Sequence, residues 1–326
     1  MDPDQDRVVA VVGIAEPDDV PGARWPERDR LRFAPTLAAL GAALPRVEIA
    51  LSWNRSAAIE GGFGAARSLR WIQTGSAGVD ALLFPALVES DVTVTNARGI
   101  FDEPMAESVM AFVLALNTGI LREQRGVWGI YRDAGAPGRR RVAGERMLVV
   151  GAGSIGRAIG RTARALGMQV SGVANRARPG DEVFDEVGSS DALLDLLPAF
   201  DVVVDVLPLT SATAHRFGAQ AFAAMADDAL FVNVGRGATV DEPALIRALE
   251  EGQIRGAALD VFEIEPLPPQ SPLWAMENVI VSPHVAGDAE GWERRVVDLF
   301  AENLTRYREG RPLLNVVDKG LGYVPT

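Results

Sequence analysis

The sequence contains no cysteine, two histidines and a single lysine among its 326 residues. Without cysteine the chain has no disulfide, no thiol nucleophile and no cysteine-ligated zinc or iron–sulfur site. Two histidines, His215 and His284, seldom suffice for a histidine-rich metal site, so no bound metal is expected. A lone lysine, Lys319, disfavours a Schiff-base enzyme and a phosphate-binding P-loop. Proton transfer near neutral pH is therefore left to one histidine or to a carboxylate with a shifted pKa.

Basic residues are also few relative to acidic ones, 32 against 44, which gives a net charge of −12. This charge disfavours nucleic acid and anionic membranes as partners, because both bind basic surfaces, and the short arginine run at 139–141 is expected to be a solvated loop. The N-terminus is acidic and no apolar run reaches the roughly 18 residues of a membrane span. We therefore expect a cytoplasmic protein of about two domains.

Two series of short β-branched runs alternate with helical patterns along the chain. The first covers residues 7–14, 47–53, 69–75 and 92–99, and the second covers 147–153, 168–174, 201–207, 229–235, 256–262 and 278–284. This alternation predicts an α/β fold with doubly wound parallel sheets. We expect two Rossmann-like domains, with a dinucleotide-binding domain of residues 98–285 inserted into a discontinuous substrate domain of residues 1–97 and 286–326.

The sharpest local motif is GAGSIG, which spans Gly151 to Gly156 between an expected strand and an expected helix. A GxGxxG pattern alone is weak, but in this context each glycine has a function. Gly151 permits a tight turn, Gly153 lets the backbone approach a pyrophosphate, and Gly156 lets helix and strand pack closely. The motif therefore predicts a dinucleotide site at a helix N-terminus, the alternative being a glycine-rich turn without a ligand.

The residues after the second strand of this domain indicate which dinucleotide binds. An NAD site usually has an acidic residue there, whereas this chain has Asn175, Arg176 and Arg178. Guanidinium groups bind a 2′-phosphate that a carboxylate would repel. The pattern favours NADP(H) and leaves NAD(H) possible, since the two arginines also fit a solvated loop.

Three further residues follow strand ends, where open α/β sheets place their ligands. They are Arg236, Glu265 and His284. An arginine can bind a carboxylate and polarise a neighbouring carbonyl, and a histidine held by a glutamate is a suitable proton donor. Each also has a structural alternative, as an ion pair, a solvated acid or a hydrogen-bonded histidine, and spacing alone does not decide between them.

Long motifs in the same order resemble the D-isomer-specific 2-hydroxyacid dehydrogenase family over nearly the whole chain. They include GAGSIGRAIG, VLPLTSAT, FVNVGRGATVDEP, ALDVFEIEP, NVIVSPHVAG and WIQTGSAGVD. The resemblance implies that Arg236 binds the substrate carboxylate and carbonyl, that His284 is the acid and base, and that Glu265 orients it. It also implies that the backbone at Gly78 and Val79 helps to hold the carboxylate.

The resemblance implies a larger set of residues around the cofactor, and assigns no role to His215, which is expected to be structural. The expected cofactor-binding residues are Gly151, Gly153, Ser154, Ile155, Gly156, Asn175, Arg176, Arg178, Leu207, Pro208, Thr213, Val234, Asp260, His284 and Gly287. Family dimers pack through the segment that here spans about 99–146. This would explain why residues 103–117 form an expected helix that is apolar on nearly every side.

Within the family, the short SAGVD pattern and the Asn-Arg pair after the second strand look most similar to glyoxylate/hydroxypyruvate reductases. The resulting hypothesis is a homodimeric oxidoreductase that transfers a hydride between NADPH and a small 2-keto acid such as glyoxylate or hydroxypyruvate. Two alternatives remain: a non-catalytic nucleotide-sensing interaction protein on the same fold, and an NAD-dependent dehydrogenase for a bulkier 2-hydroxy acid.

Overall fold

The computed structural model describes residues 7–26, 30–53, 57–120 and 139–325. The arginine run at 139–141 follows directly on the undescribed segment, and much of the predicted dimer segment lies outside the described residues. The chain divides into two compact units, Met1–Phe101 with Ala289–Thr326, and Asp102–Asp288. Within the described ranges, no helix combines the length and apolarity needed to cross a membrane.

The first unit is built on a parallel five-stranded sheet with strand order β2-β1-β3-β4-β5. Its strands are β1 (Val8–Val12), β2 (Leu31–Ala34), β3 (Val47–Ser52), β4 (Trp71–Thr74) and β5 (Thr93–Thr95). Strand β2 was not predicted, because its four residues include the polar Arg32 and make no recognisable apolar run.

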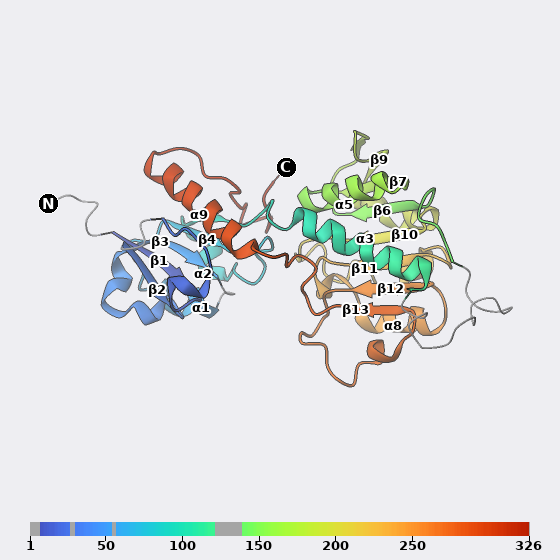
Figure 1. Cartoon of the computed structure of the whole chain (residues 1–326), viewed down its shortest axis with the longest axis horizontal. Coiled ribbons are helices and arrows are strands. Elements are labelled where there is room, and N and C mark those ends of the chain that lie inside the picture. The colour runs from blue at the N-terminus through green and yellow to red at the C-terminus, as the bar shows by residue number, and fades with distance from the viewer. Residues whose placement is uncertain (1–6, 27–29, 54–56, 121–138, 326) are drawn as a thin grey trace. The chain divides into compact units, whose positions relative to one another are not determined.

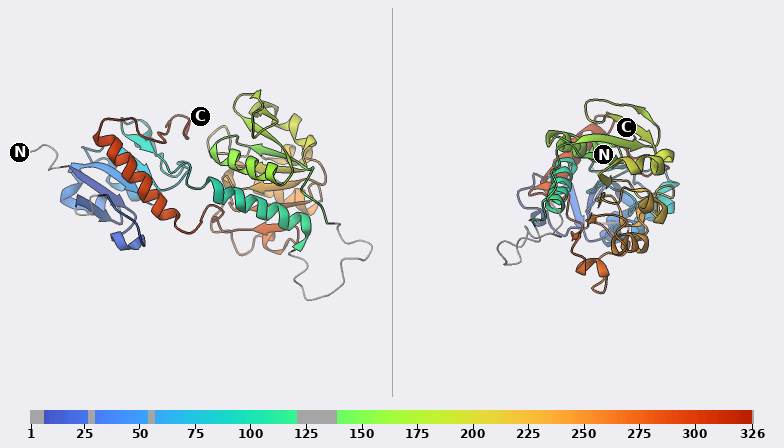
Figure 2. Two further views of the ribbon diagram at one scale, coloured as in Figure 1. Left: turned by 45° about the horizontal axis from the view of Figure 1, so that its top comes forward. Right: turned by 90° about the vertical axis from the view of Figure 1, so that its right-hand side faces the viewer.

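Alternate side chains of this first sheet point to opposite faces, and both faces are covered. Val8, Ala10 and Val12 pack with α1 (Ala57–Phe63) and α2 (Pro85–Val88). Val9 and Val11 pack with the C-terminal helix α9 (Trp292–Arg308), which lies along the sheet in Figure 2. The period of two along β1 therefore builds two apolar layers around one sheet.

The second unit has an eight-stranded sheet with strand order β13-β12-β11-β10-β6-β7-β9-β8 (Figure 1). Seven strands are parallel and only the edge pair β8 and β9 is antiparallel. The bounds are β6 (Arg146–Val150), β7 (Gln169–Ala174), β8 (Arg178–Pro179), β9 (Glu186–Ser189), β10 (Val202–Asp205), β11 (Leu230–Asn233), β12 (Gly256–Leu259) and β13 (Val279–Val281). The six predicted strands are present, whereas the short edge strands β8 and β9 were missed.

Helices cover both faces of this second sheet, which makes it doubly wound as predicted. On one face α3 (Asp102–Thr118) packs along α5 (Ser154–Ala165), and both contact the strands beneath. On the other face lie α6 (Leu193–Leu196), α7 (Ala219–Ala224) and α8 (Glu242–Glu250). In the described part of the chain, 3₁₀ segments lie at Pro17–Asp19, Ala38–Arg46, Ser190–Ala192, Leu197–Ala199, Gly237–Thr239 and Pro272–Ala275.

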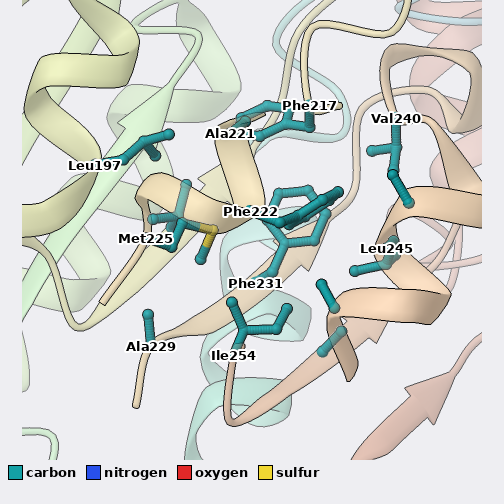
Figure 3. Packing of buried hydrophobic residues seen from close by; sticks show 14 of the residues in the cluster. Leu197, Phe217, Ala221, Phe222, Met225, Ala229, Phe231, Val240, Leu245 and Ile254 are labelled. Carbon is teal, nitrogen blue, oxygen red and sulfur yellow. The ribbon is translucent and has the colours of Figure 1, made fainter. Parts of the chain in front are cut away.

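A large apolar cluster of the second unit is aromatic at its centre. Phe231 of β11 meets Phe222 edge-to-face at 5.4 Å, and Phe217 at 4.9 Å (Figure 3). All three rings are fully buried. Aromatic side chains bury large apolar areas, so this contact fixes α7 on the sheet and thereby the loops on either side of it.

Helix α3 buries one of its faces within the chain. Met105, Ala106, Val109, Met110 and Val113 are buried on one face. Other apolar residues of the helix, including Phe112 and Leu114, stay partly exposed in the single chain. The spacing of the buried residues is that of one helical face. Packing of the remaining apolar side against a second subunit stays a prediction.

Candidate active site

The glycine motif lies in the turn from β6 into α5, and its three glycines have different reasons for lacking a side chain. Gly151 has φ of 116°, a left-handed conformation that disfavours other residues. A Cβ on Gly156 would lie 2.0 Å from the Gly151 carbonyl oxygen, whereas one on Gly153 would meet no protein atom within 4 Å. The open space at Gly153, at the head of α5, is where a pyrophosphate would approach the backbone.

This turn stands where the strand order of the sheet reverses. Strand β6 pairs with β7 on one side and with β10 on the other, so the chain winds away from it in two directions. Open α/β sheets form a crevice at the carboxyl ends of the strands at such a point. The Ser154 hydroxyl donates a short hydrogen bond to Asp102, so its proton is already engaged. The donors that α5 offers to an anion at its N-terminus are then backbone amides such as that of Ile155.

The strand β7 ends at Ala174, and the arginines that follow it differ in their surroundings. Arg178 donates to Asp181 at 3.1 Å, and Asp181 also accepts from Arg157 at 2.6 Å. The Arg157 bond is the main reason that the pKa of Asp181 lies well below its usual range. Within the described part of the chain no residue pairs with the Arg176 guanidinium, which is exposed beside Asn175. Arg176 is therefore better placed than Arg178 to meet a new anion.

Glu265 and His284 come together at the carboxyl edge of the sheet. His284 Nδ1 lies 2.7 Å from Glu265 Oε2, and the Phe262 amide donates to Glu265 Oε1 at 3.1 Å. The side chains are 39% and 24% exposed, so the pair is accessible. Because Glu265 holds Nδ1, the ring presents Nε2 as its other polar atom. His284 has φ of 60°, an uncommon conformation for a non-glycine residue.

Asp260 fixes the segment that carries His284. Its carboxylate is 2% exposed and accepts from the Ser282 hydroxyl at 2.6 Å and from the Val285 and Ala286 amides at 2.9 and 3.0 Å. These bonds bracket His284 on both sides along the chain. The sequence suggested a cofactor contact for Asp260, and the structure adds a positioning contact that spacing did not reveal.

Arg236 directly precedes the 3₁₀ turn Gly237–Thr239 after β11, and this turn touches the segment that leads to Glu265. A Cβ on Gly237 would lie 1.9 Å from the Phe262 carbonyl, so only glycine permits the approach. The Arg236 guanidinium donates to the Gly235 carbonyl at 2.8 Å. The turn of Arg236 and the His284–Glu265 pair therefore share one end of three adjacent strands, β11, β12 and β13.

The other predicted residues lie in loops at the ends of strands. Thr213 folds the segment after β10 by donating to the Pro208 carbonyl at 2.6 Å and accepting from the Thr210 amide. In the first unit the Ser76 hydroxyl donates to the Gly78 carbonyl at 2.7 Å, next to the buried Val79. The remaining ones, Leu207, Val234 and Gly287, follow β10, β11 and β13, in that order.

Two polar groups near this edge received no functional assignment from the sequence. His215 has φ of 50° and lies with its Nε2 3.2 Å from Glu263. Asp205, at the end of β10, is fully buried and bonded to Thr239 at 2.5 Å. The signal for Asp205 was present, because an acidic residue interrupts an otherwise apolar run in a strand expected to be buried on both faces.

Comparison with known proteins accounts for this arrangement. Residues 108–286 match the family model described as D-isomer specific 2-hydroxyacid dehydrogenase, NAD binding domain. The chain belongs to the D-isomer-specific 2-hydroxyacid dehydrogenase family. It is 33% identical over 262 residues to the glyoxylate reductase of Korarchaeum cryptofilum, covering 79% of this chain and 78% of that protein. The predicted family and oxidoreductase class are confirmed.

Solved structures of this family superpose on nearly the whole chain. A D-isomer specific 2-hydroxyacid dehydrogenase from Xanthobacter autotrophicus Py2, in complex with NADPH and MES, matches with a TM-score of 0.80 at 32% identity, covering 97% of this chain and 99% of that one. An NADPH-dependent glyoxylate/hydroxypyruvate reductase from Sinorhizobium meliloti, in complex with NADP and sulfate, matches with a TM-score of 0.83 at 29% identity, covering 97% and 100%. The predicted fold, with an inserted NAD(P)-binding domain, is confirmed.

Proposed function

We propose that this dehydrogenase reduces small 2-keto acids, such as glyoxylate or hydroxypyruvate, with NADPH. The observation that carries the proposal is the His284–Glu265 pair, 2.7 Å apart, beside the turn of Arg236. Relatives that are 33–35% identical are named glyoxylate or glyoxylate/hydroxypyruvate reductases, which supports the substrate class. The NADPH and NADP in similar structures support the cofactor.

The residues of the second unit fit a nicotinamide dinucleotide. The open space over Gly153 and the amides at the head of α5 would hold the pyrophosphate, and Arg176 would hold a 2′-phosphate. The loops that carry Leu207, Thr213 and Val234 would line the rest of the site. When bound, the cofactor would supply the hydride.

The protein's own groups would bind the keto acid and supply the proton. Arg236 would bind the substrate carboxylate and stabilise the negative charge that develops on the carbonyl oxygen. His284 would donate a proton from Nε2 to that oxygen, while Glu265 holds Nδ1 and so orients the ring. Asp260 would keep His284 in place through its bonds to the flanking backbone.

Several assignments extend beyond the second unit or beyond one chain. The backbone at Gly78 and Val79 would help to bind the substrate carboxylate, which makes the first unit the substrate domain. The partly exposed apolar side of α3, with Phe112 and Leu114, would pack against the same helix of a second copy in a homodimer.

A panel of substrates and cofactors tests the proposed function. Glyoxylate, hydroxypyruvate, pyruvate and a bulkier 2-keto acid are each supplied with NADPH or NADH, and nucleotide oxidation is followed by absorbance. We expect the highest kcat/KM for glyoxylate and hydroxypyruvate with NADPH. Faster turnover of the bulkier acid with NADH would contradict the proposal, and no turnover with any pair would indicate a nucleotide-sensing interaction protein instead.

Arg176→Gln is expected to weaken NADPH binding by roughly tenfold or more while leaving NADH binding unchanged, because a bond to a charged group is lost. The matched control is Arg178→Gln. Its effect on NADPH is expected to be smaller, since Asp181 already neutralises part of the Arg178 charge. Fluorescence titrations of both nucleotides give the dissociation constants. Equal losses for NADPH and NADH in Arg176→Gln would contradict a 2′-phosphate contact.

A further inference from the structure

Asp205 is a fully buried acid that the proposed chemistry does not use. It ends β10, and its register neighbours are Val150 on β6 and Asn233 on β11. Its Oδ1 accepts from the Leu207 amide at 3.0 Å, and its Oδ2 lies 2.5 Å from the Thr239 hydroxyl. One carboxyl group thus contacts the segment after β10 and the 3₁₀ turn that follows Arg236.

The Thr239 hydroxyl has two close acceptors but only one proton. It lies 2.5 Å from Asp205 Oδ2 and 2.6 Å from the Arg236 carbonyl oxygen. A hydroxyl donates one hydrogen bond, and two oxygens without a proton between them repel each other at such a distance. Both contacts are satisfied only when Asp205 donates to Thr239 and Thr239 donates to Arg236. The same neutral acid accepts the Leu207 amide on its other oxygen.

The surroundings of Asp205 favour this protonated form. The side chains next to it from β6, β11 and the turn are Val150, Asn233 and Thr239, none of which titrates. The charged residues nearest along these elements are engaged elsewhere: Arg236 donates to the Gly235 carbonyl, and His215 pairs with Glu263. Burial raises the pKa of Asp205 from its ordinary value of 3.8 to about 7.

The proton of Asp205 therefore bears on the position of Arg236. When Asp205 ionises, the Thr239 hydroxyl turns its proton to the carboxylate, and the Arg236 carbonyl loses that bond and meets an oxygen lone pair instead. The Arg236 carbonyl still accepts from the Asn233 side-chain amide at 3.1 Å and from the Thr239 backbone amide at 3.1 Å. The loss of this bond weakens the hold of the turn on Arg236, the residue proposed to bind the substrate.

We propose that Asp205 is a positioning residue that, as a neutral acid, holds the Arg236 turn through Thr239, and that its ionisation weakens binding of the 2-keto acid carboxylate. This rests on the proposed function of Arg236. The effect would fall on substrate binding, because Asp205 touches neither His284 nor Glu265 in the described contacts. Ionisation of Asp205 would therefore lower the affinity for the substrate as the pH rises through neutrality.

Asp205→Asn separates the two states, because an asparagine amide donates to Thr239 as the neutral acid does and cannot ionise. In the wild type, KM for glyoxylate is expected to rise roughly two- to tenfold between pH 6 and pH 8.5, a range set on either side of about 7. In Asp205→Asn, KM is expected to stay flat. The control is Asp201→Asn, at the other end of the same strand, which should keep the wild-type dependence.

Unfolding by urea gives a second readout that does not depend on activity. Because the pKa of Asp205 is raised in the folded protein, the folded state keeps a proton that the unfolded chain releases between pH 3.8 and about 7. Over that window the stability of the wild type should fall with rising pH relative to Asp205→Asn, and the difference should level off above pH 7.

Parallel stability profiles, or the same KM profile in both proteins, would overturn the proposal. If wild-type protein reduces no keto acid, the proposed function fails, and the unfolding profiles still decide whether Asp205 holds its proton.

Discussion

Replacing His284 with glutamine is expected to lower kcat for glyoxylate by roughly 10²- to 10⁴-fold, the usual contribution of a general acid. Glutamine cannot deliver a proton at neutral pH, although it can keep a hydrogen bond to Glu265. NADPH binding should stay within a few-fold of wild type, because the glycine motif and Arg176 are unchanged. Steady-state kinetics and a fluorescence titration of NADPH measure the two effects separately.

The second histidine gives a matched control for this variant. His215→Gln removes the same functional group from a residue that pairs with Glu263 and not with Glu265. It should retain most of the wild-type kcat. A fall in kcat of similar size in both variants, or near-normal turnover in His284→Gln, would contradict the assignment of His284 as proton donor.

Gly156→Ala is expected to lower the free energy of unfolding by at least about 1–3 kcal/mol, the usual effect of overpacking. The new Cβ would lie 2.0 Å from the Gly151 carbonyl oxygen and 3.1 Å from Val149 Cγ1, and backbone cannot give way as a flexible side chain can. Relief of the clash moves α5 away from β6, so NADPH binding should be largely lost as well. Urea unfolding and NADPH titration together measure the two effects.

Gly153→Ala is the control that separates packing from cofactor contact. Its Cβ would meet no protein atom within 4 Å, so the variant should unfold like the wild type. NADPH binding should nevertheless weaken, because the added methyl occupies the space proposed for the pyrophosphate. Normal NADPH binding in Gly153→Ala would place the cofactor elsewhere.

The sequence predicted the parts of the fold whose signal is a long apolar run. The six runs of the second series became β6, β7, β10, β11, β12 and β13. It missed β2, β8 and β9, which have two to four residues and owe their conformation to a neighbouring strand. It also predicted the apolar helix α3 without showing which of its faces packs within the chain, because hydropathy records that a residue is apolar and not which face meets another element.

The sequence predicted which residues belong to the candidate site, but not most of the hydrogen bonds between them. Motif resemblance suggested that Glu265 orients His284, and the structure places them 2.7 Å apart. The bonds of Asp260 to the backbone around His284 depend on how two strand ends lie side by side, which no spacing encodes. Asp205 is a similar case, since its partner Thr239 is distant in sequence and only the fold buries them together.

Hydride transfer from NADPH to a small 2-keto acid is the reaction proposed for this chain. The most direct measurement uses NADPH deuterated at the hydride-donating carbon of the nicotinamide, with glyoxylate as substrate and mass spectrometry of the product. We expect glycolate that carries one deuterium from the cofactor on its reduced carbon, with the hydroxyl proton coming from solvent. Glycolate without deuterium, or no glycolate, would contradict it.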